Sequence, residues 1–488
     1  MKVGFMVTNR YIDTRGKCET PVTFTEAVVK GLANGGGLFV PETLPHLSLD
    51  EILSLTDFPY AKRAAYLYRA FGIDLPEETI DQLMDSTYGD RFDDSAICPI
   101  TSLNESTHIL ELWHGPTSAF KDMALQCLPY FFSASAAQLR EQGKLNNTFL
   151  ILVATSGDTG KAALEGFRDK DGIKIAVMYP DGGVSDIQYK QMATQLGDNV
   201  MVWAVTGNFD DCQTGAKNVF NDEAFAKQLM DNHAVALSSA NSINWGRLLP
   251  QVVYYVSSYA ELVAQGKLEA GQLLDVCVPT GNFGNILAAW YAKQLGTPLG
   301  TLFCASNENR VLTDFINSGT YDIADRQFVL TPSPSMDILD EETRNKLQSD
   351  FKAEAVDSET CLRTIKEVHD AYNYIIDPHT AVAYKVAEQL RGENPVLIAS
   401  TAHWAKFGEN VYRALHDLKP GEDLPEQVAS LSGCELNKLI ADEAHCHNIP
   451  QGLAELDSLP IRFSETISGT TEAIEAAVDS FLLGKDTE

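Results

Sequence analysis

Lys121 is the residue whose type and surroundings first suggest chemistry. It lies in LWHGPTSAFKDMALQ, residues 112–126, after a Gly-Pro turn and at an expected helix start. A lysine beside apolar neighbours can be a desolvated amine with a lowered pKa, which reacts with a carbonyl group to form a Schiff base. The ordinary alternative is a surface lysine with a buried aliphatic stem, and this segment alone favours that alternative.

A glycine-containing loop at residues 281–285 is a candidate phosphate site. In VPTGNFGNILAAWYAKQL, residues 278–295, an apolar strand runs into this loop and an apolar helix follows directly. Glycines allow close approach of the backbone, and the N–H groups of a helix start attract an anion. A tight strand-to-helix turn without a ligand has the same composition, and the spacing does not choose between them. The GxGxxG spacing of a dinucleotide site is absent.

A second loop of small residues, 155–160, lies in FLILVATSGDTGKAALEGF, residues 149–167. A P-loop would need glycine at Thr155 and Ser or Thr at Ala162, so both ends of that motif fail. The remaining N–H donors and hydroxyls suit a carboxylate. A capped helix start without a ligand explains the pattern equally well.

Three further segments carry weaker signals. Ser242, Asn244 and Arg247 are close together in SSANSINWGRL, and an arginine fork suits phosphate, although a surface arginine paired with a carboxylate is the simpler explanation. The cluster at 445–447 has soft ligands but no recognised zinc spacing, so we expect no metal. The segment 377–380, Asp-Pro-His-Thr, is typical of a turn before a helix.

Alternating apolar runs and helical patterns predict the elements that position these loops. Helices are expected at 161–167, 285–295 and 405–415, among others. Continuous apolar runs are typical of strands buried on both faces of a parallel sheet, so we expect an α/β fold with ligands at the carboxyl ends of the strands. The expected strands are 149–154, 173–178, 200–205, 274–278, 301–305 and 395–399.

Composition limits the classes of function. The chain has 488 residues, enough for two or three domains, and a net charge of −30 from 37 Lys and Arg against 67 Asp and Glu. Such a charge disfavours nucleic acid and anionic membranes as partners, and an anionic ligand would require local positive charge. Nine cysteines without a CxxC pair, no signal-peptide pattern at the start and no membrane-length apolar run predict a soluble cytoplasmic protein.

Taken together and in this order, HGPTSAFKD, ATSGDTG, NSINWGR and TGNFGN resemble the threonine synthase family. The likeness extends from about residue 11 to about residue 410 and includes YIDTRG, PSPSMDI, DPHTAVA and STAHWAKF. It implies the tryptophan-synthase-β-like fold of pyridoxal-phosphate (PLP) enzymes, fold type II, with two α/β subdomains around parallel sheets and an added N-terminal segment. The implied domains are 1–97 and a catalytic region, 98–488, in which a small subdomain at about 126–244 is inserted. Trp404 stands where proline is expected in most relatives.

The resemblance also implies roles for individual residues. Lys121 matches the lysine that carries PLP, Asp158 lies near the cofactor ring, and Thr401, in preference to Ser400, supplies a hydroxyl beside the pyridine nitrogen. The residues that match the loop around the cofactor phosphate are Gly281, Asn282, Phe283, Gly284 and Asn285. The residues that match substrate contacts are Ser156, Gly157 and Thr159 for the carboxylate, and Ser242, Asn244 and Arg247 for the phosphate.

The implied reaction converts O-phospho-L-homoserine and water to L-threonine and phosphate, with PLP as the electron sink. Lys121 would carry most of the proton transfers, and Arg247 would stabilise the departing phosphate. One rival is a related PLP lyase that releases a 2-oxo acid, which only the product distinguishes. Another is a binding protein that has lost catalysis, which is disfavoured because Lys121 and the loop 281–285 are both present. A monomer and a homodimer are both consistent with the sequence.

Overall fold

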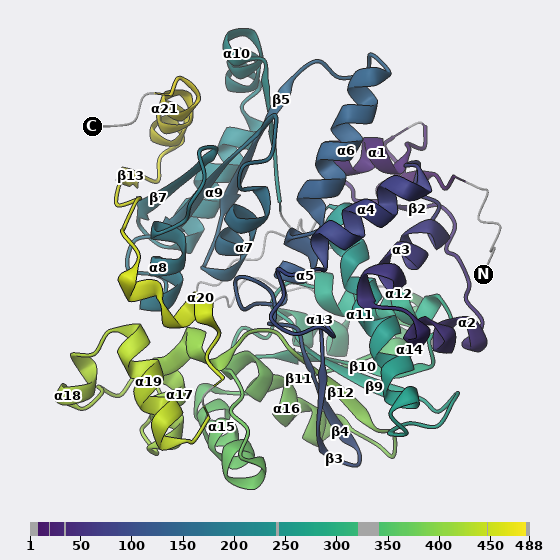
Figure 1. Cartoon of the computed structure of the whole chain (residues 1–488), viewed down its shortest axis with the longest axis vertical. Helices are drawn as coiled ribbons and strands as arrows, with labels where there is room; N and C mark the ends of the chain where they lie inside the picture. The colour runs from purple at the N-terminus through teal and green to yellow at the C-terminus, as the bar shows by residue number, and fades with distance from the viewer. Residues whose placement is uncertain are drawn as a thin grey trace.

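The computed structural model describes residues 8–18, 20–33, 36–240, 244–320, 341–446 and 448–484. Two predominantly parallel sheets, each covered by helices, make up most of the described structure, as Figure 1 shows. A third, two-stranded sheet lies near the N-terminus. This arrangement confirms the predicted α/β fold with parallel sheets.

The larger sheet has six strands, all parallel except β3, which is antiparallel to β4. The predicted strands at 274–278, 301–305 and 395–399 are confirmed as β9, β10 and β12. In spatial order the strands are β11 (Phe351–Ala355), β10 (Leu299–Ser306), β9 (Leu274–Pro279), β12 (Val396–Ser400), β4 (Thr107–Glu111) and β3 (Ile100–Asn104).

Helices cover both faces of this sheet, which explains its continuous apolar strands. Along β9, Val276 and Val278 belong to the core that includes α11 and α12, whereas Cys277 faces α15 and α16. The first face is covered by α11 (Trp245–Ala264) and α12 (Gly284–Gln294), and α5 (Asp122–Leu125) packs on α11. The neighbouring helix α6 (Leu128–Glu141) lies against the other main sheet, where its Phe132 ring contacts Phe149. The second face is covered by α15 (Ser358–Tyr372) and α16 (Pro378–Leu390). At the β10 and β11 edge lie α13 (Val311–Ser318) and α14 (Glu341–Asp350).

The smaller sheet is parallel throughout, and its predicted strands at 149–154, 173–178 and 200–205 are confirmed as β5, β6 and β7. Its order is β13 (Thr466–Ser468), β7 (Val200–Thr206), β6 (Ile173–Pro180), β5 (Thr148–Ala154) and β8 (Val235–Ser238). Its helices are α7 (Asp158–Phe167), α8 (Asp186–Ala193), α9 (Phe209–Asn221), α10 (Glu223–His233) and α21 (Thr471–Leu482). Because β13 and α21 follow residue 465, the C-terminal tail returns to complete this sheet.

The N-terminal segment packs on α6 and α11 through aromatic side chains. Phe24 contacts Phe131 with ring centroids 6.1 Å apart, and Tyr11 contacts Trp245 at 6.0 Å. Its elements are β1 (Tyr11–Asp13), α1 (Phe24–Lys30), β2 (Phe39–Pro41), α2 (Leu49–Ser54), η1 (Leu55–Asp57), α3 (Tyr60–Ala70) and α4 (Glu77–Thr87).

The region after β12 forms a separate helical core around Trp404, Val411 and Ile440. The helix predicted at 405–415 is wrong in its first turn, because a 3₁₀ turn, η2 (Trp404–Phe407), precedes α17 (Gly408–Leu415). The other elements here are α18 (Glu426–Ala429), α19 (Gly433–Glu443), α20 (Gln451–Ala454) and η3 (Leu456–Ser458).

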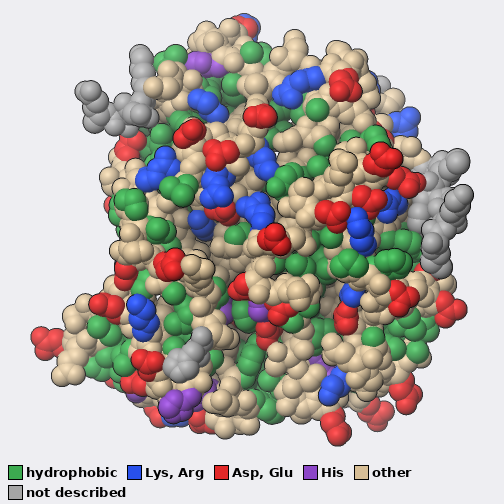
Figure 2. Space-filling model, in the orientation of Figure 1, with side chains coloured by type: hydrophobic (Ala, Val, Ile, Leu, Met, Phe, Trp, Pro, Cys, Tyr) green, Lys and Arg blue, Asp and Glu red, His purple; other side chains and the backbone are tan. Residues whose placement is uncertain are grey.

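The surface charge and the apolar character of the helices in the described part of the chain agree with what the composition predicts. Acidic side chains are spread across the face in Figure 2, with basic side chains interspersed among them. None of the described helices combines the length and apolar character that a membrane span requires.

Candidate active site

The loop before Lys121 runs along the segment that follows β12. Leu112 donates its backbone N–H to Ser400 O at 3.0 Å, and Phe120 donates to Thr401 O at 2.8 Å. Ala119 and Ala402 form an isolated antiparallel bridge next to the second of these contacts. The backbone thus brings Lys121, at the start of α5, beside Thr401 at the carboxyl end of the central strand β12.

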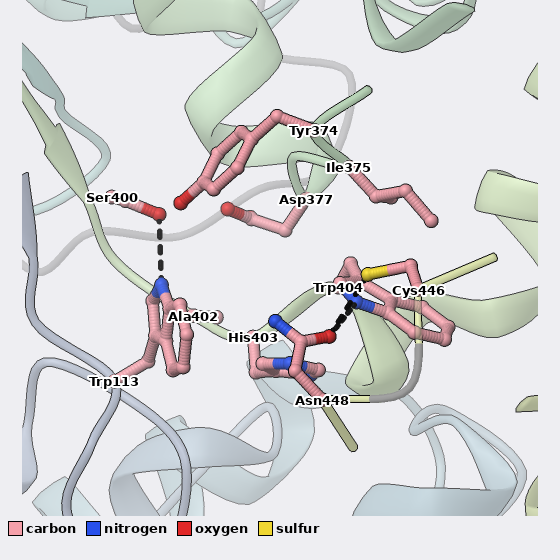
Figure 3. A pocket seen from close by; sticks show the side chains of 10 residues that line it. All are labelled: Trp113, Tyr374, Ile375, Asp377, Ser400, Ala402, His403, Trp404, Cys446 and Asn448. Atoms are coloured by element: carbon pink, nitrogen blue, oxygen red, sulfur yellow. Dashed lines mark hydrogen bonds between the residues drawn. The ribbon is translucent and has the colours of Figure 1, made fainter. Parts of the chain in front are cut away.

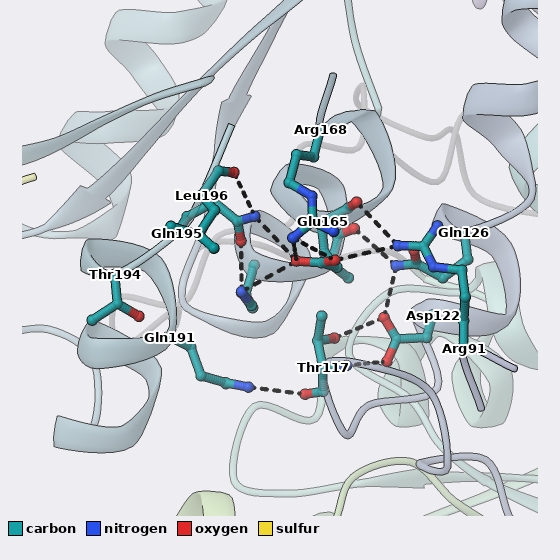
Figure 4. A network of polar contacts seen from close by, with 12 residues as sticks. Arg91, Thr117, Asp122, Gln126, Glu165, Arg168, Gln191, Thr194, Gln195 and Leu196 are labelled. Atoms are coloured by element: carbon teal, nitrogen blue, oxygen red, sulfur yellow. Dashed lines mark hydrogen bonds and ion pairs between the residues drawn. The ribbon is translucent and has the colours of Figure 1, made fainter. Parts of the chain in front are cut away.

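A buried carboxylate holds this loop in shape. Asp122 accepts hydrogen bonds from the Thr117 backbone N–H and hydroxyl, both at 2.8 Å, and from Gln126 Nε2 at 3.0 Å. Gln191 donates to Thr117 O at 3.2 Å and so connects the loop to α8 (Figure 4). Burial raises the pKa of Asp122, although the hydrogen bonds from Thr117 oppose that effect.

Lys161 binds Gln195 and Glu165, which lie close together in Figure 4. The Lys161 amine donates to Gln195 Oε1 at 2.5 Å and lies 3.6 Å from Glu165 Oε2. Glu165 also pairs with Arg91 at 3.3 Å and with Arg168 at 3.2 Å. Lys161 is therefore engaged in contacts around α7, which agrees with the absence of a P-loop motif.

Lys121 itself is half-buried, and its amine lies 4.6 Å from the centroid of the Phe120 ring. Its pKa is lowered to about 8, and burial is the largest cause. The positive charges of Arg247 and Lys406 also lower this pKa, whereas Asp158 and Asp122 act in the opposite direction. The amine is accordingly much closer to its neutral, nucleophilic form at neutral pH than an exposed lysine would be.

The loop at 155–160 forms a turn of backbone N–H groups at the start of α7. Thr155 Oγ1 accepts from the N–H groups of Gly157 at 3.0 Å and Gly160 at 2.9 Å. Gly157 has φ of +134°, and a Cβ there would lie 2.4 Å from Gln188 Nε2, so glycine is required. Ser156 is exposed and Thr159 is partly exposed, as contacts to a ligand would need.

Asp158, the first residue of α7, is bound by two other elements. Lys406 Nζ in η2 lies 2.9 Å from Asp158 Oδ1, and Gln188 Nε2 in α8 donates to the same oxygen at 2.9 Å. Burial opposes ionisation of Asp158, but the charges of Lys406 and Lys121 hold its pKa well below the usual range. Lys406 has no role assigned from the sequence, although it lies within the STAHWAKF segment that carries the resemblance.

The loop at 281–285 leaves open space at the carboxyl end of β9. A Cβ at Gly281 would meet no atom within 4 Å, and no side chain caps the N-terminus of α12. Gly281 and Asn282 are exposed, while Phe283 and Gly284 are partly exposed. Such a helix start presents N–H donors to an anion.

Asn285 is fixed from behind this loop. Its Oδ1 accepts hydrogen bonds from the hydroxyls of Tyr254 and Tyr255, both at 2.6 Å. Its Nδ2 is buried and has no hydrogen-bond partner among the described residues. An unpaired buried donor of this kind is costly and is expected where a ligand supplies the acceptor.

Arg247 lies in the first turn of α11 and is buried. Its Nη1 donates to Ala240 O at 2.7 Å, whereas its Nε is buried without a partner in the described part of the chain. Burial lowers the pKa of Arg247 to about 10.

Asn244 caps the same helix, because its Oδ1 accepts a hydrogen bond from Gly246 N at 2.9 Å, and its Nδ2 donates to Val28 O at 2.8 Å. Ser242 lies outside the described residues, so its predicted role stays a prediction.

Two hydroxyls at the end of β12 differ in their contacts. Ser400 Oγ is already bonded to Trp113 Nε1 at 3.2 Å and to the hydroxyl of Thr380 at 3.0 Å. Thr401 is buried beside Phe120 and uses its backbone oxygen for the contact with that residue. Of the two hydroxyls, only that of Ser400 is bound by Trp113 and Thr380, and the Thr401 hydroxyl takes no part in these contacts.

Trp404 lines a small cavity of about 20 Å³ at the end of β12, which Trp113 and Ala402 also line (Figure 3). Its indole donates to Asn448 Oδ1 at 3.5 Å, and Asp377 and Ser400 contribute to the wall. A space of this size has room for a single water molecule and not for a substrate. Trp404 thus packs against the C-terminal helices.

His379 is, after Lys406, a second residue of the candidate site that has no role assigned from the sequence. The predicted turn at 377–380 is confirmed, since Asp377 caps α16. Asp377 Oδ1 lies 2.9 Å from His379 Nδ1, and the imidazole contacts the Phe407 ring. Burial lowers the pKa of His379, but the contact with Asp377 raises it overall, and Asp158 and Lys121 are among the charges that act on it.

Most of the chain matches models of known protein families. Family models match at residues 10–88, "Threonine synthase N terminus", at 102–401, "Pyridoxal-phosphate dependent enzyme", and at 380–478, "Threonine synthase, C-terminal". The "Threonine synthase" of Pseudomonas aeruginosa is 35% identical over 489 residues, covering 92% of this chain and 97% of that protein.

Two further comparisons extend this result. The human "Threonine synthase-like 1" is 41% identical over 445 residues, which cover 82% of this chain but only 59% of the human protein, so the chain spans about three fifths of that relative. A solved structure titled as PLP-bound threonine synthase from Brucella melitensis has a TM-score of 0.79 and 30% identity, covering 96% of this chain and 98% of the other. The chain belongs to the threonine synthase family of pyridoxal-phosphate-dependent enzymes.

Proposed function

We propose that this chain is a threonine synthase, which converts O-phospho-L-homoserine and water to L-threonine and phosphate with PLP on Lys121. The observation that carries the proposal is the half-buried Lys121 amine, whose pKa is lowered to about 8 between Arg247, Lys406 and Asp158. Family membership supports the same assignment.

The residues of the site fit PLP. Its aldehyde needs a neutral amine, which Lys121 offers. Its phosphate needs N–H donors and space, which the uncapped start of α12 and the open side of Gly281 offer, with Asn285 Nδ2 as a buried donor without a described partner. In this proposal Gly281, Asn282, Phe283, Gly284 and Asn285 hold that phosphate, while Asp158 and Thr401 lie beside the ring. Bound PLP supplies an electron sink for negative charge that develops on the substrate.

The substrate would lie between two anion-binding groups. Ser156, Gly157 and Thr159 at the start of α7 would bind its carboxylate through N–H groups and hydroxyls. Arg247, with Ser242 and Asn244, would bind its phosphate; the buried Arg247 Nε without a described partner supports this role. Local cations are needed here because the chain as a whole carries a net charge of −30.

Lys121 would carry the proton transfers because its amine lies closest to the reacting carbons once it holds the cofactor. It would remove and return protons at the substrate's Cα and Cβ, where a group with a pKa near the working pH is effective. Arg247 would stabilise the negative charge on the departing phosphate.

The test is product identity. Purified full-length chain loaded with PLP is incubated with O-phospho-L-homoserine, and threonine, 2-oxobutyrate and phosphate are measured. Equal amounts of threonine and phosphate are expected, with no turnover by Lys121→Ala and unchanged turnover by Lys227→Ala, a control on the exposed face of α10. Phosphate with 2-oxobutyrate would instead identify a lyase, and no turnover by folded, PLP-loaded protein would reject the assigned substrate.

We also propose the domain division expected from the sequence, an N-terminal part to residue 97 and a small subdomain at about 126–244 inserted into the rest. The separate sheet of β5, β6, β7 and β8 supports it. The contribution of β13 adds a C-terminal segment to that subdomain. Limited proteolysis followed by mass spectrometry tests these boundaries.

A cytoplasmic location is part of the proposal, supported by nine cysteines that are all unpaired. We expect no nucleic-acid or membrane partner, and a monomer or a homodimer in solution. Light scattering coupled to size-exclusion chromatography distinguishes the two assembly states, and fractionation of cells that express the natural protein tests its location.

A further inference from the structure

Lys406 is a second buried amine at the proposed site. Its side chain is 0% exposed, and its Nζ lies 2.9 Å from Asp158 Oδ1 and donates to Thr117 O at 2.9 Å. Thr117 belongs to the loop that ends at Lys121, and Asp158 begins α7. A fully buried lysine is costly unless it is paired, so these contacts fix Lys406 between the two loops.

The two amines compete for one carboxylate. Asp158 acts electrostatically on both Lys121 and Lys406, but only Lys406 lies at ion-pair distance. Among the described residues Lys121 forms no ion pair, and its amine lies over the Phe120 ring instead. Lys406 therefore binds the carboxylate that Lys121 would otherwise bind, while Gln188 occupies the same oxygen from α8.

The charged groups that face Lys121 come from five elements. Asp122 lies next to it on α5, Asp158 on α7, Arg247 on α11, His379 on α16 and Lys406 in η2. Burial is the largest influence on its pKa, and of these groups the two carboxylates raise the pKa whereas the two other permanent cations lower it. Loss of Lys406 would remove a lowering influence and also leave Asp158 free to pair with Lys121.

We propose that Lys406 is a positioning residue: by binding Asp158 it keeps that carboxylate from pairing with Lys121 and leaves the Lys121 amine available for the cofactor. This inference rests on the proposed role of Lys121 but not on the identity of the substrate. A purely structural role for Lys406 would change stability without changing the pH at which Lys121 becomes reactive.

The experiment measures that pH directly in the full-length apoprotein. Lys121 is labelled with acetic anhydride across a pH series and quantified by mass spectrometry, and the rate of PLP attachment is followed by absorbance. In Lys406→Met the labelling midpoint is expected to move to higher pH, with PLP attachment near neutral pH slower by about tenfold, the effect of about one pH unit in pKa. Lys406→Arg should restore both values.

A double variant separates the proposal from misfolding. Lys406→Met combined with Asp158→Asn removes both charges of the pair, so the labelling midpoint is expected to return toward that of the unmodified chain. Lys227→Met, at an exposed lysine on α10, is the matched control and should change neither value. An unchanged midpoint in folded Lys406→Met, or a shift that persists in the double variant, would overturn the proposal. A failure to make threonine would leave the labelling result unaffected, so the two proposals are tested separately.

Discussion

Phe120 donates its backbone N–H to the carbonyl oxygen of Thr401 at 2.8 Å, and this bond joins the loop of Lys121 to the end of β12. The two residues are distant in sequence, but the contact places the backbone of Thr401 beside the residue that precedes Lys121. Its neighbour Ser400 is used differently, because Trp113 and Thr380 both bind the Ser400 hydroxyl.

The first prediction distinguishes these two hydroxyls. Thr401→Val keeps the shape of the side chain but removes its hydroxyl, so PLP affinity is expected to fall while the apoprotein remains as stable as before. Ser400→Ala removes a hydroxyl that forms two buried hydrogen bonds and is expected to cost about 1 kcal/mol of unfolding free energy with little change in PLP affinity. PLP titration by absorbance and urea unfolding measure the two effects, and Thr401→Ser should restore affinity. If Ser400→Ala weakens PLP binding and Thr401→Val does not, the hydroxyl beside the pyridine nitrogen belongs to Ser400.

The second prediction concerns the open side of Gly281. A Cβ there meets no protein atom within 4 Å, so Gly281→Ala should change the unfolding free energy of the apoprotein by no more than about 0.5 kcal/mol. The methyl group would project into the space assigned to the cofactor phosphate, and PLP affinity is expected to fall by about tenfold or more, a loss of about 1.4 kcal/mol in binding.

Gly392→Ala is the matched control, because a Cβ at that position also meets nothing within 4 Å and the residue lies in the connection from α16 to β12. Both variants are compared by PLP titration and by thermal unfolding of the apoprotein. Equal PLP affinity in the two variants would exclude Gly281 from the phosphate site.

The sequence predicted the sheets better than the polar contacts of the site. Six apolar runs became six strands because burial on both faces of a sheet leaves a local signal, visible in the adjacent residues Val276 and Cys277, which belong to the cores on opposite faces. No local signal marks the pair of Lys406 with Asp158, since Lys406 follows β12 and Asp158 follows β5, which are strands of different sheets. The strand β13 was missed because it has only three residues at a sheet edge.

The start of the helix predicted at 405–415 shows a different limit. His403 Nδ1 accepts a hydrogen bond from Ala405 N at 3.2 Å, so the first turn closes as η2 and the α-helix begins only at Gly408. The apolar periodicity of the segment is the same whether the α-helix begins at residue 405 or at residue 408. Helix boundaries depend on such capping contacts, which a single sequence does not specify.

The third prediction concerns the pH dependence of stability at His114, whose imidazole lies 2.5 Å from Asp93 Oδ1 and 2.9 Å from Glu111 Oε2. Burial lowers its pKa, but these hydrogen bonds outweigh burial and raise it to about 9. The unfolded value is about 6.5, so the stabilisation is complete below about pH 6.5 and is lost as the pH rises through about 9.

His114→Gln is therefore expected to destabilise the protein more at about pH 6 than at about pH 10, as measured by urea unfolding followed by tryptophan fluorescence. His416→Gln serves as control, because His416 pairs with Glu443 on the surface and its loss should have a small effect at either pH. The same destabilisation by His114→Gln at both pH values would contradict the raised pKa.

The last prediction tests Arg247 with a ligand that needs no turnover. In PLP-loaded protein the cofactor occupies its own phosphate site, so added inorganic phosphate is expected to bind at the proposed site for the substrate phosphate. A ligand that binds the folded state alone raises the melting temperature, and the rise grows with its concentration relative to Kd. The buried Arg247 Nε, which has no partner among the described residues, is the donor available to such an anion.

Arg247→Met is expected to abolish most of the phosphate-dependent rise in melting temperature and to raise KM for O-phospho-L-homoserine by about tenfold or more, because an Arg–phosphate contact is a charge-assisted hydrogen bond. The loss of the bond to Ala240 O also lowers the starting melting temperature, so the shift caused by phosphate is the quantity compared. Arg310→Met, at an exposed arginine paired with Asp314, should keep the full shift. A full shift in Arg247→Met would place the substrate phosphate elsewhere in the site.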